Sequence, residues 1–280
     1  MRFVRPIRVV HPFPSALDAV AVGIIALIAG AQVGLALRLA LGMLGLQFAI
    51  GAANDFADAP TDRLVRPDKP IPAGFPRRAA AGMSVTAAGL GLVAAATAGP
   101  GALAVGVVGL VDGLVYDLRL KGTPLAWVPF ALGVGLLPLY AWLGARGAVA
   151  PAFAAVVALA ATAGAALALA NALVDIGKDR LVGVVSVATY LGAGRTLAAN
   201  ASLLVLINLA TVASTLAVSG ASPLLFVEVC GCALGWAGLG LAAATSYQAR
   251  PASWEIQAGG SVVLGSAWLA VLDSAGLLSG

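Results

Sequence analysis

Long apolar runs recur from one end of this chain to the other, and they limit the folds open to it. Of its 280 residues, 61% are hydrophobic and only 10% are charged. A run of about 20 apolar residues is long enough to cross the hydrocarbon core of a bilayer. Backbone groups in lipid must bond within their own segment, so each run is expected to form a helix. The nine runs lie at residues 15–31, 34–53, 77–97, 100–117, 124–144, 150–171, 193–218, 222–245 and 256–275.

The basic residues indicate how these helices cross the membrane. Of the 16 Lys and Arg residues, all but Arg38 and Arg146 precede the first run or follow the second, fourth, sixth or eighth. Because Lys and Arg concentrate in cytoplasmic loops, we expect the N-terminus and the ends of even-numbered helices in the cytoplasm. Nine spans then place the C-terminus outside. The first run is expected to be a retained helix rather than a cleaved signal peptide.

Two polar clusters interrupt this apolar pattern. The chain has only 12 acidic residues, yet the pattern Asn-x3-Asp-x3-Asp occurs twice, each time where an apolar run ends. Positions i, i+4 and i+8 share one face of a helix. Each cluster therefore predicts a stripe of carboxylates at a helix end. The two stripes are Asn54, Asp58 and Asp62, followed by Asn171, Asp175 and Asp179.

Four helices separate the two stripes, which places both on the same side of the membrane. This spacing predicts an all-α fold of two four-helix halves plus a ninth helix, arranged around a central cavity. Carboxylates repel one another by about 1 kcal/mol at ~4 Å in water and by more in a less polar setting. Mg²⁺, which binds a few carboxylates plus substrate phosphate oxygens, would offset that repulsion. The plainer alternative is that these polar residues simply end the helices and face water.

Basic residues surround the acids and suit a phosphorylated ligand. Arg binds phosphate in a bidentate manner, whereas Lys acts as a point charge. Cytoplasmic loops are basic in any case, so no single cation is decisive. Lys121 is the strongest individual candidate, because it follows Tyr116 and Asp117 at the end of the fourth run. The others are Arg63, Arg66, Lys69, Arg119, Lys178 and Arg180.

Three motifs together resemble the UbiA superfamily of membrane prenyltransferases. Residues 54–74 read Asn-Asp-x2-Asp-x3-Asp followed by Arg-Pro-x-Lys-Pro-Ile-Pro-Ala-Gly, similar to the first aspartate-rich motif of that family. Residues 116–124 resemble its Tyr-x4-Lys motif, and residues 171–183 resemble its second aspartate-rich motif. The likeness spans nearly the whole chain and implies one prenyltransferase-like domain over residues 1–280. It also implies transfer of an isoprenyl group from a prenyl diphosphate to a small acceptor within the bilayer.

The resemblance also implies a role for each polar residue. Asp58, Asp62, Asp175 and Asp179 are expected to hold Mg²⁺ and, with Lys121 and Tyr116, to carry the reaction. The residues expected to bind substrate are Asn54, Asp55, Arg63, Arg66, Lys69, Asp117, Arg119, Asn171, Lys178 and Arg180. The acceptor stays open among aromatic acids, quinone precursors, porphyrins, sugar phosphates and glycerol phosphate. Nucleic acid is not an expected partner.

The second acidic motif departs from the family pattern. Ala172 stands where the family often has Asp, and Val184 and Val185 stand where cations often follow the motif. Two other functions therefore remain as alternatives: a non-catalytic member of the same fold, and an ion- or proton-coupled transporter. A transporter would place polar residues at the membrane midplane and on both faces. His11 is the only histidine and is expected to lie at the membrane interface, because one histidine cannot build a metal site.

Overall fold

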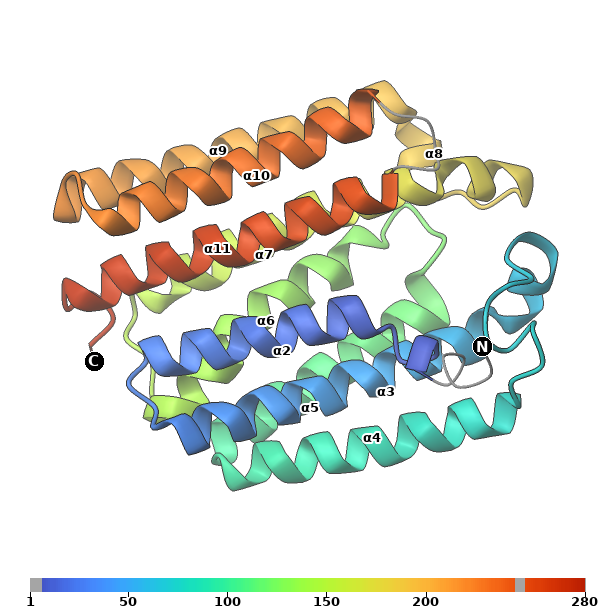
Figure 1. Cartoon of the computed structure of the whole chain (residues 1–280), viewed down its shortest axis with the longest axis horizontal. Helices are drawn as coiled ribbons and strands as arrows, with labels where there is room; N and C mark the ends of the chain where they lie inside the picture. Colours follow the sequence, from blue (N-terminus) through green and yellow to red (C-terminus); the bar gives the residue numbers. More distant parts are fainter. Residues whose placement is uncertain (1–6, 245–249, 280) are drawn as a thin grey trace. The chain divides into compact units, whose positions relative to one another are not determined.

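The computed structural model describes residues 7–244 and 250–279, and within those ranges the chain is helical with no strand (Figure 1). This confirms the all-α prediction. The elements are α2 (Pro12–Ile28), α3 (Val33–Val65), α4 (Arg77–Thr97), α5 (Pro100–Val115), the π-helical turn η1 (Tyr116–Leu120), α6 (Trp127–Arg146), α7 (Phe153–Leu181), α8 (Val187–Leu191), α9 (Ala193–Ser219), α10 (Pro223–Ala244) and α11 (Arg250–Ser274).

Each predicted apolar run coincides with a long helix. Eight helices of the described part are long and apolar enough to cross a membrane, and α2, with 17 residues, is slightly shorter. Many large hydrophobic side chains on these helices are exposed, among them Leu37, Leu90 and Phe226. Such surfaces suit lipid rather than water. The protein is a multi-pass integral membrane protein.

Two helices continue well beyond their apolar runs, and both carry an acidic motif. Helix α3 extends to Val65, where Pro67 disfavours helical geometry at Arg66. Helix α7 extends to Leu181 and ends with Gly183 at φ +71°, while the Val184 amide donates to the Asp179 carbonyl over 2.9 Å. This is the glycine-terminated helix end in which a left-handed residue allows the chain to cap the last carbonyls. Both motifs are therefore helical, as their spacing predicted.

The chain divides into two compact units. The first contains Met1–Arg119 and Leu139–Ala148, and the second contains Leu120–Pro138 and Val149–Gly280. Helices α2 to α5 belong to the first unit, as the predicted first half requires. The fifth predicted helix is present as α6, but its assignment to one half needs a correction. Residues of α6 up to Pro138 belong to the second unit, and residues from Leu139 belong to the first. The single domain and the central cavity stay predictions.

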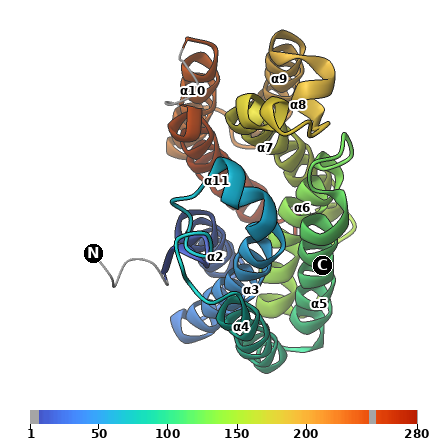
Figure 2. The ribbon, with the colours of Figure 1, turned by 90° about the vertical axis from the view of Figure 1, so that its right-hand side faces the viewer.

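Within the first unit, α3 lies between α2 and α4 and packs against both (Figure 2). Glycines allow the close approach of α3 and α4. A Cβ on Gly91 would lie 2.8 Å from the Leu46 amide nitrogen and 2.9 Å from the Gly42 carbonyl oxygen. In the second unit, Gly231 and Gly260 bring α10 and α11 together in the same way. Small residues of this kind are the usual means by which helices pack in lipid.

Replacing Gly91 with Ala is expected to destabilise the first unit by about 1–3 kcal/mol, because the added methyl group meets backbone atoms of α3. The measurement is the thermal unfolding temperature in detergent. Gly89→Ala is the matched control on the same helix, since its Cβ would meet nothing within 4 Å. Equal unfolding temperatures for the two variants would contradict the packing described here.

Candidate functional site

The first acidic motif lies on the last turns of α3. Pro60 in this stretch has no backbone N–H and cannot bond the carbonyl of Phe56, four residues earlier. Arg77 supplies a donor instead, because its Nε donates to the Phe56 carbonyl over 3.1 Å and its guanidinium lies 4.0 Å from the centre of the Phe56 ring. The helix thus continues through Pro60 and keeps Asp58 and Asp62 one turn apart.

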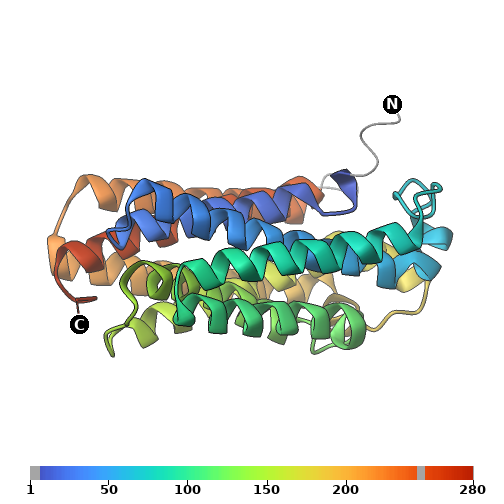
Figure 3. The same ribbon diagram turned by 90° about the horizontal axis from the view of Figure 1, so that it is seen from below.

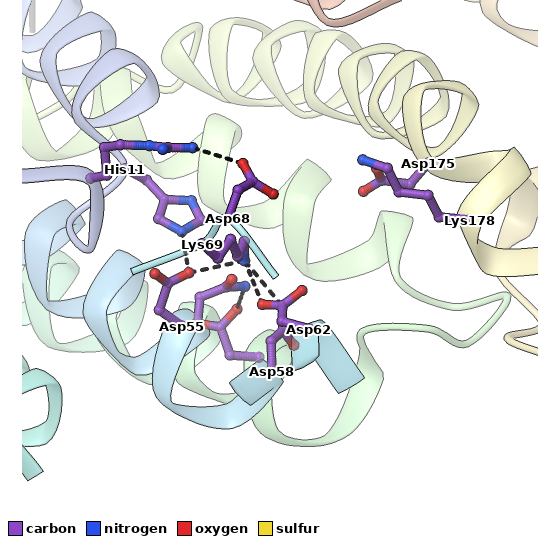
Figure 4. A network of polar contacts seen from close by, with 11 residues as sticks. His11, Asp55, Asp58, Asp62, Asp68, Lys69, Asp175 and Lys178 are labelled. Carbon is purple, nitrogen blue, oxygen red and sulfur yellow. Dashed lines mark hydrogen bonds and ion pairs between the residues drawn. The ribbon is translucent and has the colours of Figure 1, made fainter. Parts of the chain in front are cut away.

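The ammonium group of Lys69 lies among three carboxylates of α3 (Figure 4). Its Nζ is 2.9 Å from Asp55 Oδ1, 2.9 Å from Asp62 Oδ2 and 3.9 Å from Asp58 Oδ2. The side chains of Lys69, Asp55 and Asp62 are 13%, 2% and 7% exposed. A shared cation offsets the repulsion among acids that are this close and this buried. The three acids therefore converge on one positive charge.

The connection between α3 and α4 presents Lys69 to these acids. In Figure 3 this loop joins the end of α3 to the start of α4. The Lys69 amide donates to the Arg66 carbonyl over 3.0 Å, and the Ala73 amide donates to the Lys69 carbonyl over 2.9 Å. Ile71 is buried in an apolar cluster that also contains Val10. These contacts fix the backbone of Lys69, so its side chain has a defined direction.

His11 is a site residue that sequence reasoning missed. Its Nε2 lies 3.0 Å from Asp55 Oδ1, the same oxygen that accepts from Lys69 (Figure 4). His11 was expected to lie at the membrane interface, and a contact with Asp55 was not predicted. The two residues are 44 positions apart, and no local pattern links them. The sequence offered one hint: His11 is the single histidine of the chain, and it directly precedes Pro12.

Asn54 and Asp117 are bonded to each other. The Asn54 Nδ2 donates to Asp117 Oδ1 over 2.6 Å, and both residues are buried. Asp117 lies on η1, the π-helical turn that ends α5, and such turns often occur at functional sites. The bond explains why Asp117 is directed toward α3. Asn54 Oδ1 is buried and has no hydrogen-bond partner among the described residues.

The remaining residues predicted for this part of the site differ in exposure. Arg63 and Arg119 are exposed, whereas Arg66, Tyr116 and Lys121 are half-buried. Tyr116 opens η1, and Lys121 follows its last residue. Their roles stay predictions.

The second acidic motif lies on α7 in the second unit. Asn171, Asp175 and Asp179 are half-buried, as expected for a polar stripe. Lys178 Nζ lies 3.6 Å from Asp175 Oδ1 (Figure 4). Lys178 and Arg180 are exposed. The convergence of this motif with the motif on α3 stays a prediction.

Buried residues hold α7 in place. Leu173 and Ile176 pack against Ala188 of α8, so this face of α7 is apolar. The acidic stripe occupies a different face. The short helix α8 thus supports α7 where the motif lies.

Two acidic side chains in apolar helices are each hydrogen-bonded to a side chain of a neighbouring helix. Gln47 Nε2 donates to Asp18 Oδ2 over 2.7 Å between α2 and α3. Thr215 Oγ1 donates to Glu228 Oε1 over 2.6 Å between α9 and α10. Each pair satisfies a polar group inside the membrane region, where an unpaired one is expensive. Neither hydrogen bond involves a residue of the two acidic motifs.

The acidic residues fit Mg²⁺ in their chemistry. No three His, Cys, Asp or Glu side chains of the described part form a ready-made metal site. Mg²⁺ does not require one, because it binds through one or two carboxylates together with substrate phosphates. The position of the Lys69 ammonium group shows that Asp58 and Asp62 can face the same cation. The unpartnered Asn54 Oδ1 is a neutral acceptor one helical turn before Asp58 on α3.

The fold and site define a polytopic membrane protein with a carboxylate cluster at the end of an extended helix. The sequence model of the UbiA prenyltransferase family matches residues 17–258. The chain therefore belongs to the UbiA prenyltransferase family. This confirms the resemblance seen in the motifs and the class of enzyme expected from it, a prenyltransferase.

One curated relative is similar over part of its length. The digeranylgeranylglyceryl phosphate synthase of Methanopyrus kandleri is 36% identical over 123 residues, which are 42% of this chain and 45% of the relative. The chain thus matches less than half the length of that protein.

Solved structures of the family have the same fold. A UbiA homologue from Aeropyrum pernix superposes with a TM-score of 0.72 at 19% identity, covering 90% of this chain and 96% of that one. A homologue from Archaeoglobus fulgidus, bound to DMAPP and Mg²⁺, gives a TM-score of 0.70 at 17% identity, covering 92% and 99%. At these identities the likeness establishes the fold.

Lys69→Met is expected to destabilise the protein by about 3–5 kcal/mol, because it leaves buried carboxylates without their cation. Added millimolar Mg²⁺ is expected to raise the unfolding temperature of this variant by more than that of the wild type. Thermal unfolding in detergent with and without Mg²⁺ measures both effects. Lys178→Met is the control, since its half-exposed pair contributes about 1 kcal/mol or less. A Lys69→Met variant as stable as the control would refute the cluster.

Proposed function

We propose that this protein transfers an isoprenyl group from a prenyl diphosphate to an acceptor hydroxyl inside the membrane, with Mg²⁺ as cofactor. The observation that carries the proposal is the convergence of Asp55, Asp58 and Asp62 on one cation in a member of this family. An acidic cluster of this kind suits a polyanion that arrives with its own metal ions. The structure of the Archaeoglobus fulgidus homologue with DMAPP and Mg²⁺ supports both the donor and the metal.

In this scheme, Asp58 and Asp62 hold one Mg²⁺, and Asp175 and Asp179 hold another. Bound metal would supply charge neutralisation on the diphosphate. Asn54 and Asn171 orient the phosphate oxygens or metal-bound water through their amides. The scheme requires the two motifs to face one ligand, which is part of the proposal.

The reaction needs one bond to break and one to form. The bond between the first carbon of the donor and the diphosphate oxygen breaks, and both of its electrons leave with the diphosphate. Lys69 and Lys121 stabilise that leaving charge together with arginines. The acceptor oxygen then attacks the cation-like carbon, and its proton passes to the departing diphosphate. Tyr116 faces this carbon in the proposal and stabilises it through its ring. The other cations proposed to hold the diphosphate are Arg63, Arg66, Arg119, Lys178 and Arg180.

The acceptor we propose is the hydroxyl group of a glyceryl phosphate. The Methanopyrus kandleri relative is a digeranylgeranylglyceryl phosphate synthase, a name that describes a glyceryl phosphate carrying two isoprenyl groups. The many exposed apolar helices suit a donor and acceptor that reach the site through lipid. Assays that offer a glyceryl phosphate ether or an aromatic acid to the same membranes would separate this acceptor from the aromatic class.

Asp58→Asn and Asp175→Asn are each expected to lower turnover at least about 100-fold, because each removes a metal ligand that acts in the transition state. Excess EDTA is expected to abolish turnover of the wild type. Transfer of radiolabelled prenyl groups in membranes measures both. Asp68→Asn is the control, since Asp68 is exposed and forms an ion pair with the exposed Arg8, away from the acidic cluster. Full activity in either Asn variant, or in EDTA, contradicts the mechanism.

The site is proposed to face the cytoplasm. Arg146 Nε donates to the Ala29 carbonyl over 2.9 Å, at the C-terminal end of α2, whereas His11 at the N-terminal end of α2 meets Asp55. Arg146 is one of the two basic residues that do not fit the cytoplasmic pattern. It thus lies at the end of the first unit opposite the acids of α3. The positive-inside rule then places the acids and the N-terminus in the cytoplasm, and nine spans place the C-terminus outside.

Single cysteines at positions 68 and 148 test this orientation. Both positions are exposed and lie near opposite ends of the first unit. In a background lacking Cys230 and Cys232, a membrane-impermeable maleimide is expected to label Asp68→Cys only in inverted vesicles. It is expected to label Ala148→Cys only in right-side-out vesicles. The reverse pattern would place the site outside.

A further inference from the structure

The contact between His11 and Asp55 is supported by the fold around it. Val9 and Val10 are buried in one apolar cluster with Ala52 of α3 and with Ile71, which lies in the same α3–α4 connection as Lys69. The residues that flank His11 and Lys69 are therefore anchored in the same place. Both side chains reach the same oxygen of Asp55 from that anchor.

The backbone at His11 is adapted to this contact. His11 has φ 48° and ψ 68°, and it is the one non-glycine residue of the described part with positive φ. Ser15 Oγ donates to the carbonyls of Val10 and His11 over 2.9 and 3.0 Å. On α3, a Cβ at Gly51 would lie 2.9 Å from the Val10 carbonyl carbon and 3.3 Å from the His11 Cβ. A glycine is thus required for the segment to come this close.

We propose that His11 is a positioning residue of the transfer reaction. By donating from Nε2 to Asp55, it fixes the carboxylate that keeps Lys69 Nζ beside Asp58 and Asp62. In the proposed function Lys69 is one of the cations that bind the diphosphate, so His11 would act on the donor through Asp55 and Lys69. This inference rests on the proposed function, and it assigns a role to the only histidine of the chain.

The charge arrangement explains why a second donor is needed. Asp55 is 2% exposed, and its Oδ2 has no hydrogen-bond partner among the described residues. Lys69 is shared with two more acids. Without His11, Asp55 would depend on Lys69 alone and could rotate, and the ammonium group would shift with it. The first consequence is weaker binding of the diphosphate.

Three variants of His11 separate positioning from packing. Asn tolerates positive φ but its amide is one bond too short for Asp55. Gln places its amide nitrogen four bonds from Cα, as His places Nε2, and restores the donor. Phe keeps the ring volume without a donor. Arg8→Gln is the matched control, because the exposed Arg8–Asp68 pair joins the same segment to the same loop over 3.4 Å.

The experiment measures KM for the prenyl diphosphate and kcat in membranes, with thermal unfolding as a check of folding. We expect H11N and H11F to raise KM about tenfold and to leave kcat within about twofold, the size of a lost hydrogen bond to a charged group. H11Q is expected to lie within about twofold of wild type, and R8Q to match wild type. Equal KM for H11N and H11Q, or the same rise in R8Q, overturns the proposal.

Binding of inorganic pyrophosphate with Mg²⁺, measured by calorimetry, gives a readout that does not need turnover. The same order of variants is expected: wild type, R8Q and H11Q together, with H11N and H11F about tenfold weaker. If the wild type shows no transfer but this order holds, the proposed function fails and the role of His11 at the diphosphate stands. If all five proteins bind equally, the role of His11 is refuted.

Discussion

The cost of gathering carboxylates at the end of α3 is the constraint on which the structure around the site depends. Asp55, Asp58 and Asp62 come within 3.9 Å of one lysine nitrogen, and two of the three are almost fully buried. Burying that much negative charge is unfavourable unless a cation is held among the acids. The chain meets this requirement with Lys69, and the elements around it serve to keep that lysine in place.

Several local features follow from this constraint. The loop that carries Lys69 is closed by backbone hydrogen bonds and anchored by Ile71. The N-terminal segment brings His11 to Asp55, and Gly51 lets that segment approach α3. Arg77 bonds the carbonyl that Pro60 leaves without a partner. The members of the cluster are thus already ordered, which would reduce the reorganisation needed to bind the proposed charged ligand.

Hydropathy predicted the helices, and the spacing of the acids predicted that α3 and α7 continue beyond their apolar runs. Both signals are local, so a sequence reveals them. Pairings such as His11 with Asp55 or Gln47 with Asp18 join residues 44 and 29 positions apart, and no periodicity indicates them. The bond from Arg77 to the Phe56 carbonyl, which Pro60 cannot reach, is likewise visible only in the fold. The divided α6 was equally hidden, because its apolar run is continuous in sequence.

The proposed mechanism requires the acids of α3 and α7 to hold one metal-bound diphosphate together. A double-mutant cycle on Asp58→Asn and Asp175→Asn tests it most directly, with the affinity for a non-reactive prenyl thiodiphosphate in Mg²⁺ as the measured quantity. If the two motifs share the ligand, either single variant loses nearly all the affinity that the double variant loses. Losses that simply add, or a motif whose loss leaves affinity unchanged, would contradict the account.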